Sequence, residues 1–277
     1  MTSKLELLLA ERRPLVMGVV NVTPDSFSDG GRYLKVGAAV ERALSMVKEN
    51  VDIVDIGGES TRPGANPVPQ ETEIKRVIPV IQRIREKSEV CISVDTSTPE
   101  VMRQAALVGC NIINDVRSLT REGALDAAAE TGLAVCLMHM KGEPSNMQNN
   151  PSYENLIEEI CDFFSERISA CKHVGIERGR LLIDPGFGFG KTAIHNLEII
   201  NRLRQFKCFD LPILVGLSRK STIRKILGGN QEMLKMGSVA AALIASLNGA
   251  NVLRVHDVEE TVASLRVAQS IVNESFF

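Results

Sequence analysis

Eight short apolar segments, rich in β-branched residues, recur along the chain, and each is followed by a stretch with helical spacing. Continuous apolar runs of this length are typical of parallel strands buried on both faces. Their alternation with helices, without a break in composition, predicts a closed (β/α)8 TIM barrel that forms one domain over residues 1–277. The segments are LVMGVVN (15–21), DIVDIGG (52–58), VCISVDT (90–96), NIINDV (111–116), AVCLMH (134–139), LLIDPG (181–186), PILVGLS (212–218) and NVLRVHD (251–257).

The intervening stretches carry apolar residues three and four positions apart, which predicts helices with one buried face each. This spacing is clear over 74–84, 156–171 and 258–272. Thr98 followed by Pro99 indicates an N-cap and the first residue of a helix. Every strand segment is thus followed by its own crossover helix, as a barrel requires.

Net charge, the amino-terminal segment, the length of the apolar runs and the cysteine spacing each bear on the class of protein. Lys and Arg number 32 against 34 Asp and Glu, a net charge of -2, so the chain has no field for holding a nucleic-acid backbone. The N-terminal segment MTSKLELLLAERRPL lacks a cleavage site, and no apolar run is long enough to span a bilayer. The six cysteines show no C-x-x-C spacing, which favours core thiols in a reducing cytoplasm.

Polar residues gather where the apolar segments end, and a barrel brings all these ends to one mouth. Loops are polar in any protein, but that does not explain carboxylates and cations within apolar contexts such as ISVDT, LLIDP and LRVHD. A pocket at the mouth is therefore predicted. The residues are Asn21, Glu59, Ser60, Thr61, Asp95, Asn114, Asp115, His139, Asp184, Ser218, Arg219, Lys220, Arg254 and His256.

The segment DPGFGFGKT (184–192) is similar to a phosphate-binding loop but does not match it. The pattern G-x-x-x-x-G-K-[ST] requires glycine where Pro185 stands. A G-x-G-x-x-G/A match would fall in the sixth unit of the chain, whereas that fingerprint belongs to a first βαβ unit. The glycines instead indicate a thin backbone that lets Phe187 or Phe189 cover a flat ligand, with Asp184 facing the mouth. The long connections 21–33 and 57–71 are expected to act as lids.

Eight motifs, in order along nearly the whole chain, resemble dihydropteroate synthases of folate biosynthesis. They are MGVVNVTPDSFSDGG, DIGGESTRPGA, ISVDTSTPEV, IINDVRSL, LMHM, DPGFGFGK, GLSRKS and RVHDVEET. The resemblance implies a barrel, usually a homodimer, that joins 6-hydroxymethyl-7,8-dihydropterin diphosphate to 4-aminobenzoate and releases diphosphate with the help of Mg²⁺. It also implies that sulfonamides compete for the aminobenzoate site.

The same resemblance assigns roles to individual residues, with catalysis by Asp95, Lys220, Arg254 and His256. For the pterin pocket it implies Asp95, Asn114, Met138, Asp184, Phe189, Gly216 and Lys220. For the diphosphate it implies Asn21, Thr61, Arg254 and His256, with Asn21 also on the metal. For aminobenzoate it implies Phe27, Thr61, Arg62, Pro63, Phe189 and Ser221.

The expected chemistry is a carbocation-like substitution, because the pterin ring can delocalise the charge left when diphosphate departs. Asp95 would lie near that charge, while the lids exclude water. Two other functions are compatible with all or some of these motifs. A pterin-dependent methyltransferase on the same barrel would not need SRKS, RVHD or the lid loops, and a catalytically silent pterin-binding paralogue would carry every motif.

Overall fold

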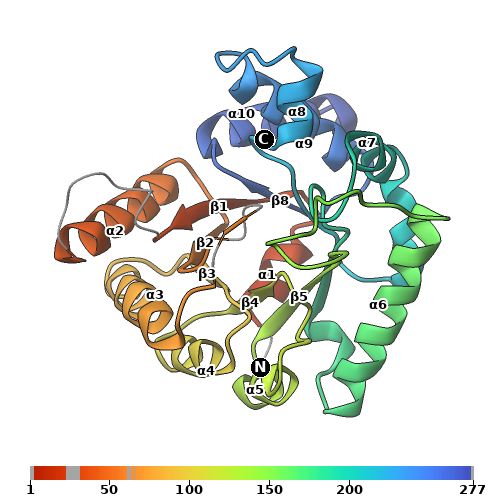
Figure 1. Ribbon diagram of the computed structural model, residues 1–277. Helices are drawn as coiled ribbons and strands as arrows, with labels where there is room; N and C mark the ends of the chain where they lie inside the picture. The colour runs from red at the N-terminus through yellow and green to blue at the C-terminus, as the bar shows by residue number, and fades with distance from the viewer. Residues whose placement is uncertain (1–2, 23–31, 61–63, 66, 276–277) are drawn as a thin grey trace.

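The computed structural model describes residues 3–22, 32–60, 64–65 and 67–275, and within them eight parallel strands form one nearly closed barrel (Figure 1). Neighbouring strands follow the order β6-β5-β4-β3-β2-β1-β8-β7. A single parallel bridge, Ile183 to Ile213, joins β6 to the segment before β7. The predicted strands are confirmed, most of them shortened by one or two residues at an end. They are β1 (Leu15–Asn21), β2 (Ile53–Gly57), β3 (Cys91–Asp95), β4 (Ile112–Asp115), β5 (Ala134–Met138), β6 (Leu181–Asp184), β7 (Leu214–Gly216) and β8 (Val252–Val255).

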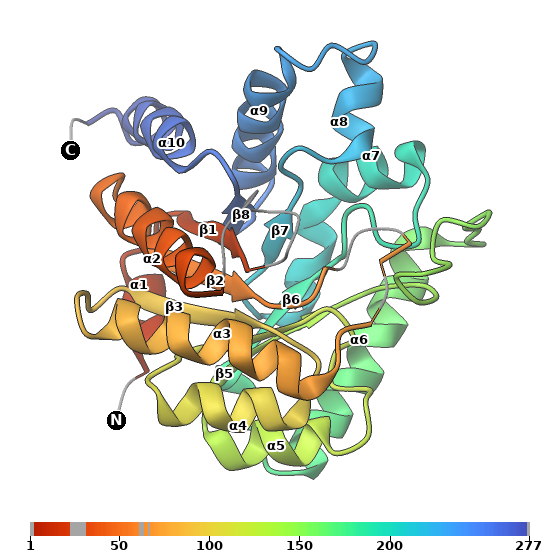
Figure 2. The same ribbon diagram turned by 60° about the vertical axis from the view of Figure 1, so that its left-hand side comes forward.

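Helices surround the barrel, as Figures 1 and 2 show. The predicted helical stretches are confirmed; in the first, Val77, Ile81 and Ile84 are fully buried against the sheet. Two helices follow β7, where the pattern predicts one. The α-helices are α1 (Lys4–Ala10), α2 (Arg32–Lys48), α3 (Gln70–Arg85), α4 (Pro99–Leu107), α5 (Ala124–Thr131), α6 (Leu156–His173), α7 (Ala193–Asn201), α8 (Ser221–Ile226), α9 (Leu234–Leu247) and α10 (Val258–Asn273), with 3₁₀ turns η2 (Arg178–Arg180) and η3 (Leu203–Phe209).

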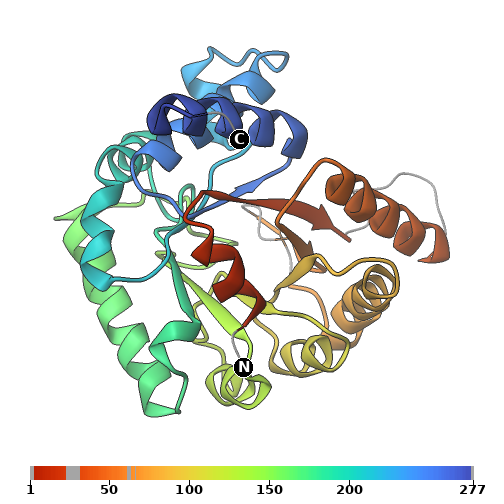
Figure 3. The ribbon, with the colours of Figure 1, turned by 180° about the vertical axis from the view of Figure 1, so that it is seen from behind.

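The short helix α1 closes the end of the barrel opposite the mouth, which Figure 3 shows from behind. Leu5 is buried there among strand residues that point inward, including Leu15, Met17 and Ile53. Ser3 and Glu6 form a capping box that starts this helix. The amino-terminal sequence therefore seals the inner core, a role that its short apolar run did not predict.

Helix α4 begins at Pro99 as predicted, with Thr98 in the N-cap position, but the Thr98 hydroxyl does not cap the helix. It donates instead to Glu73 Oε2 at 2.6 Å, and the Thr96 hydroxyl donates to Glu73 Oε1 at 2.5 Å. Glu73 is fully buried, and burial raises its pKa against the two hydroxyl bonds, which lower it. Helix α3 is thus tied to the segment directly after Asp95, the last residue of β3.

Candidate active site

Strand register places several of the predicted residues next to one another at the barrel mouth. Asn21 is paired with Gly57, Gly57 with Asp95, and Asp95 with Asn114, across four adjacent strands. Further round, Met138 is paired with Asp184, and Gly216 with Arg254. Residues more than two hundred positions apart therefore share one rim, as the barrel prediction requires.

Arg254 is the centre of the charged cluster. Its Nε donates to Asp55 Oδ2 at 2.6 Å, and a terminal nitrogen donates to Asp95 Oδ2 at 2.7 Å. Gly216 on the next strand lies beside it, and a Cβ added there would make ordinary contact with the Arg254 side chain at 3.7 Å. Burial lowers the pKa of Arg254, but Asp55 and Asp95 outweigh burial and raise it. The guanidinium group is therefore charged and held by two carboxylates.

Asp55 belongs to this cluster but was not among the residues predicted from the sequence. It is fully buried in the middle of β2, and Asn114 Nδ2 donates to the same Oδ2 atom at 3.2 Å. Its Oδ1 atom has no hydrogen-bond partner among the described residues, nor has Ser93 Oγ on the paired position of β3. The sequence did contain a signal for Asp55, namely a carboxylate inside the apolar segment DIVDIGG. Such a buried group needs a cation as its partner, which would have predicted a place for it in the charged cluster.

The mouth also carries Asp184, the last residue of β6, and Lys220, which follows β7. Asp184 is buried and accepts the backbone N–H of Gly186 at 2.8 Å. Lys220 is the N-cap residue of α8, and its Nζ lies 3.9 Å from the centre of the Phe189 ring. Burial and Arg254 lower the pKa of Lys220 to about 8, against Asp184 and Asp95, which raise it. A carboxylate, an ammonium group and an aromatic face thus adjoin one another.

The pKa values of the two rim carboxyl groups predict how stability varies with pH. Burial raises the pKa of Asp95 to about 7, although Arg254 lowers it. Burial also raises the pKa of Asp184 to about 6, although the Gly186 N–H and Lys220 lower it. A carboxyl group whose pKa rises on folding gives stability that is complete below its unfolded pKa and is lost as the pH rises through its folded pKa.

We expect Asp184→Asn to gain stability relative to the unsubstituted chain as the pH rises from about 4 through about 6. Urea unfolding of both proteins across that range measures the difference in unfolding free energy. A difference that is the same at every pH would contradict the assignment of a raised pKa to Asp184.

The glycine-rich segment after β6 places Phe189, and not Phe187, at the mouth. Phe187 is 2% exposed and packs in the layer between sheet and helices, whereas Phe189 contacts Val116, Met138 and Met147. Three glycines of the segment have positive φ angles: Gly186, Gly188 and Gly190. The sequence left the two phenylalanines as alternatives, and the path of the backbone decides between them.

Gly186→Ala is expected to destabilise the fold strongly. The residue has φ +71°, and an added Cβ would lie 1.8 Å from the His139 carbonyl oxygen. We expect a loss of about 3 kcal/mol or more in unfolding free energy, measured by urea denaturation. Gly132→Ala is the control, because Gly132 has φ +68° with nothing within 4 Å of an added Cβ. Its cost is about 1 kcal/mol; equal losses in the two variants would refute the steric explanation.

Two more of the predicted residues lie at strand ends, Asn21 as the last residue of β1 and His256 directly after β8. His256 Nδ1 is 3.2 Å from Ser218 Oγ, and Asn21 Oδ1 lies beside Gly57. Arg219 pairs with Asp257 at 2.5 Å, which supports the interpretation of Arg219 as an ordinary ion-pair residue. Phe27, Thr61, Arg62 and Pro63 lie outside the described residues.

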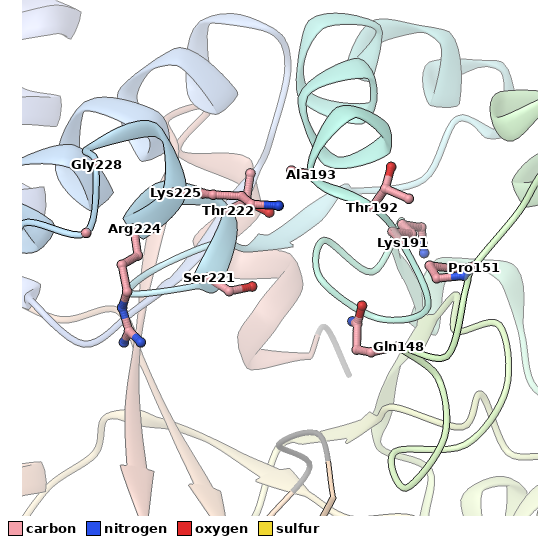
Figure 4. A pocket seen from close by; sticks show the side chains of 11 residues that line it. Gln148, Pro151, Lys191, Thr192, Ala193, Ser221, Thr222, Arg224, Lys225 and Gly228 are labelled. Carbon is pink, nitrogen blue, oxygen red and sulfur yellow. The ribbon is translucent and has the colours of Figure 1, made fainter.

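Ser221, the first residue of α8, lines a cavity of about 710 Å³ between α7 and α8 (Figure 4). Lys191 and Thr192 line it from the other side, and Arg224 and Lys225 add two further cations. Asp95, Asn114 and Asp184 are not among its lining residues, so this cavity adjoins the charged cluster and does not contain it.

Comparison with known proteins gives a consistent result. Residues 17–256 match the family of pterin binding enzymes. The chain is 52% identical over 257 residues to the dihydropteroate synthase of Escherichia coli (strain K12), covering 93% of this chain and 91% of that protein. The Yersinia pestis dihydropteroate synthase structure with a sulfonamide drug complex matches with a TM-score of 0.90 and 46% identity, covering 95% of each chain. The Xanthomonas albilineans dihydropteroate synthase structure with 4-aminobenzoic acid matches with a TM-score of 0.89 and 49% identity, covering 94% of this chain and 93% of that one.

Proposed function

The chain belongs to the dihydropteroate synthase family of pterin binding enzymes, and on that premise we propose how its barrel mouth performs the family's reaction. The enzyme is a transferase that condenses 6-hydroxymethyl-7,8-dihydropterin diphosphate with 4-aminobenzoate into 7,8-dihydropteroate and releases diphosphate. One observation carries the site assignment: Asp55 and Asp95 hold Arg254 at the mouth, and the charges of Asp184 and Lys220 act on that same guanidinium group and on each other.

In our proposal the pterin lies at the mouth, between Asp95, Asp184 and Lys220. Its aminopyrimidine edge presents N–H donors beside acceptors, which a carboxylate and an amide can pair with, and Asp184 and Asn114 supply these groups. Lys220 donates to the ring carbonyl. Met138 and Phe189, which belong to one apolar cluster, form an apolar wall for the flat ring, and Gly216 would lie beside the ring.

The diphosphate would lie over Asn21, Arg254 and His256, with Thr61 as a further ligand outside the described residues. Asn21 offers one amide oxygen at the end of β1, and the described residues contain no cluster of three or more His, Cys, Asp or Glu that could hold a metal. One oxygen ligand fits a Mg²⁺ that is bound mainly through phosphate oxygens and water. When bound, Mg²⁺ neutralises charge on the leaving group.

The bond between the pterin methylene carbon and the diphosphate oxygen breaks first, and its electron pair leaves with the diphosphate. The ring delocalises the cation that remains, and the lone pair of the aminobenzoate nitrogen then forms the new bond to the methylene carbon, after which the nitrogen releases a proton to water. Asp95 stands beside the developing positive charge, so its carboxylate lowers the barrier electrostatically. Arg254 holds that carboxylate in place and faces the leaving group.

Aminobenzoate would bind over Phe189 and near Ser221, where the cationic cavity of Figure 4 can accept its carboxylate. Phe27, Thr61, Arg62 and Pro63 complete this part of the proposal, although they lie outside the described residues. The structure with 4-aminobenzoic acid from X. albilineans supports this substrate.

The function is tested by incubating the protein with the pterin diphosphate, Mg²⁺ and labelled 4-aminobenzoate, and scoring the joined product. Formation of labelled dihydropteroate with release of diphosphate is expected, and a chelator is expected to suppress it. Pterin binding without product would identify a silent paralogue and refute the proposal. Methyl transfer from a methylated pterin would instead identify the methyltransferase.

We further propose a homodimer of two single-domain subunits. Helices α9 and α10 pack side by side and leave large apolar side chains exposed, among them Met236, Ile244, Leu247, Val267 and Ile271. Several large exposed apolar side chains on two adjacent helices are typical of a subunit contact. We expect the molar mass measured by light scattering to be twice that of the monomer. The Ile271→Glu variant should have a molar mass closer to that of the monomer.

A cytoplasmic location is also proposed. The six cysteines are free, as is typical of proteins from a reducing compartment. In the part of the chain that the structure describes, no helix combines the length and apolar character needed to cross a bilayer.

A further inference from the structure

Lys191 is buried in a manner that its sequence motif did not predict. Its side chain is 2% exposed, at the end of the glycine-rich segment between β6 and α7, and Figure 4 shows it beside Thr192. Within the described ranges, no carboxylate lies within 4.0 Å of its ammonium group. Burial lowers the pKa of Lys191 to about 7, although Asp184 raises it, so below that pH the buried ammonium group depends on its hydrogen bonds in place of water.

Those hydrogen bonds join two segments of the mouth. Lys191 Nζ donates to the carbonyl oxygen of Phe189 at 3.0 Å and to that of His139 at 3.3 Å. It also lies 2.8 Å from His139 Nδ1. Burial and the charge of Lys191 lower the pKa of His139 to about 2, so the imidazole is neutral and its Nδ1 accepts a hydrogen bond. The ammonium group thus fastens the segment after β5 to the segment after β6.

The segment after β6 carries two side chains of the pterin pocket. Asp184 begins it, and its carbonyl oxygen accepts the backbone N–H of His139 at 2.9 Å. Phe189 packs against Met138 and lies beneath Lys220. A shift of the fastened backbone would therefore move both the carboxylate and the aromatic wall.

The charge of Lys191 also acts on Asp184. The charged or titratable groups around Lys191 are Asp184 from β6, His139 and Lys141 from the segment after β5, and Lys220 from the start of α8. Burial raises the pKa of Asp184, whereas the Gly186 N–H, Lys220, Lys191 and Arg254 lower it. Lys191 is thus one of three cations that favour the ionised carboxylate.

We propose that Lys191 is a positioning residue for pterin binding, which fixes the backbone of the Asp184 to Phe189 segment and keeps Asp184 ionised. It contacts no reacting atom. The inference rests on the proposed assignment of Asp184 and Phe189 to the pterin pocket.

The test uses the full chain with Lys191→Met, which keeps the length of the side chain and removes both its charge and its donors. We expect the KM for pterin diphosphate to rise about tenfold or more while kcat changes by less than about threefold. We also expect the acid limb of pterin binding, measured by calorimetry across pH, to move to higher pH, because Asp184 loses a neighbouring cation. A purely structural role would not move this limb.

Lys191→Gln separates the two parts of the role, and it also serves if the methionine variant does not fold. Glutamine can still donate to a carbonyl oxygen but carries no charge, so the KM should rise less while the acid limb still moves. Lys172→Met is the matched control: Lys172 is exposed in the last turn of α6, away from the groups named around Lys191, so both readouts should match the unsubstituted chain.

Two results would overturn the inference. One is an unchanged KM for the pterin in a folded Lys191→Met protein. The other is an acid limb that stays in place in both Lys191 variants. Failure of the unsubstituted chain to bind the pterin at all would instead refute the proposed function, so the two failures are distinguishable.

Discussion

Arg254→Met is expected to cost about 3–5 kcal/mol of unfolding free energy, because it leaves two buried carboxylates without their cation. Asp55 is fully buried and Asp95 is 6% exposed, and both accept hydrogen bonds from this guanidinium group. The same change should lower kcat/KM by about a thousandfold or more, since Asp95 loses its support and the diphosphate loses a cation. Urea denaturation and steady-state kinetics measure the two effects.

Arg103→Met is the control for loss of an arginine. Arg103 pairs with Glu130 on the outer helices, in contact with solvent, so its removal should leave both the denaturation midpoint and the kinetics unchanged. Arg254→Lys keeps a charge but has one nitrogen in place of the planar fork, and it should restore stability better than activity. Normal kcat/KM in a folded Arg254→Met protein would refute the central place given to this residue.

Asp95→Ala is expected to lower kcat about a thousandfold while the Kd for the pterin changes less than about tenfold. The reason is that the carboxylate stabilises charge that develops only as the diphosphate leaves. Arg254 keeps Asp55 as a partner, so the variant should fold. Single-turnover kinetics and calorimetry with the pterin measure the two quantities.

Asp95→Asn distinguishes charge from shape at this position. It keeps the size of the side chain, and it should lose turnover nearly as severely as the alanine variant. In the unsubstituted chain, kcat/KM should rise as the pH passes about 7, because burial raises the pKa of Asp95 to that value in the protein without substrate. Equal losses of turnover and pterin affinity would indicate that Asp95 only binds the substrate.

The sequence predicted the fold well because each strand is a local property of the chain. A run such as CISVD needs only its own β-branched residues to indicate a buried strand, and eight such runs leave few architectures. Helix α1 was missed because it lies outside the repeating pattern. The second helix after β7 was missed because the repeat provides one helix for each strand.

The site was predicted only in part, because some of its residues follow from strand ends and others depend on contacts between distant segments. One rule, that strand ends meet at the mouth, was sufficient to bring Asp95, Asn114 and Arg254 together. The pairing of Arg254 with Asp55 follows from barrel register between β8, β1 and β2, which no single segment contains. The hydrogen bonds of Lys191 depend on the path of a glycine-rich backbone, which glycine permits but does not dictate.

Between β6 and β7 the barrel has a seam, where one parallel bridge, Ile183 to Ile213, joins the two sides, whereas every other neighbouring pair of strands is joined over three or more residues. Asp184 stands on one side of this seam, and Lys220, after β7, stands on the other. A heterocycle bound by both side chains would bridge the two sides of this seam. If the pterin is bound by both side chains, as proposed, we expect its binding to stabilise the barrel most between β6 and β7.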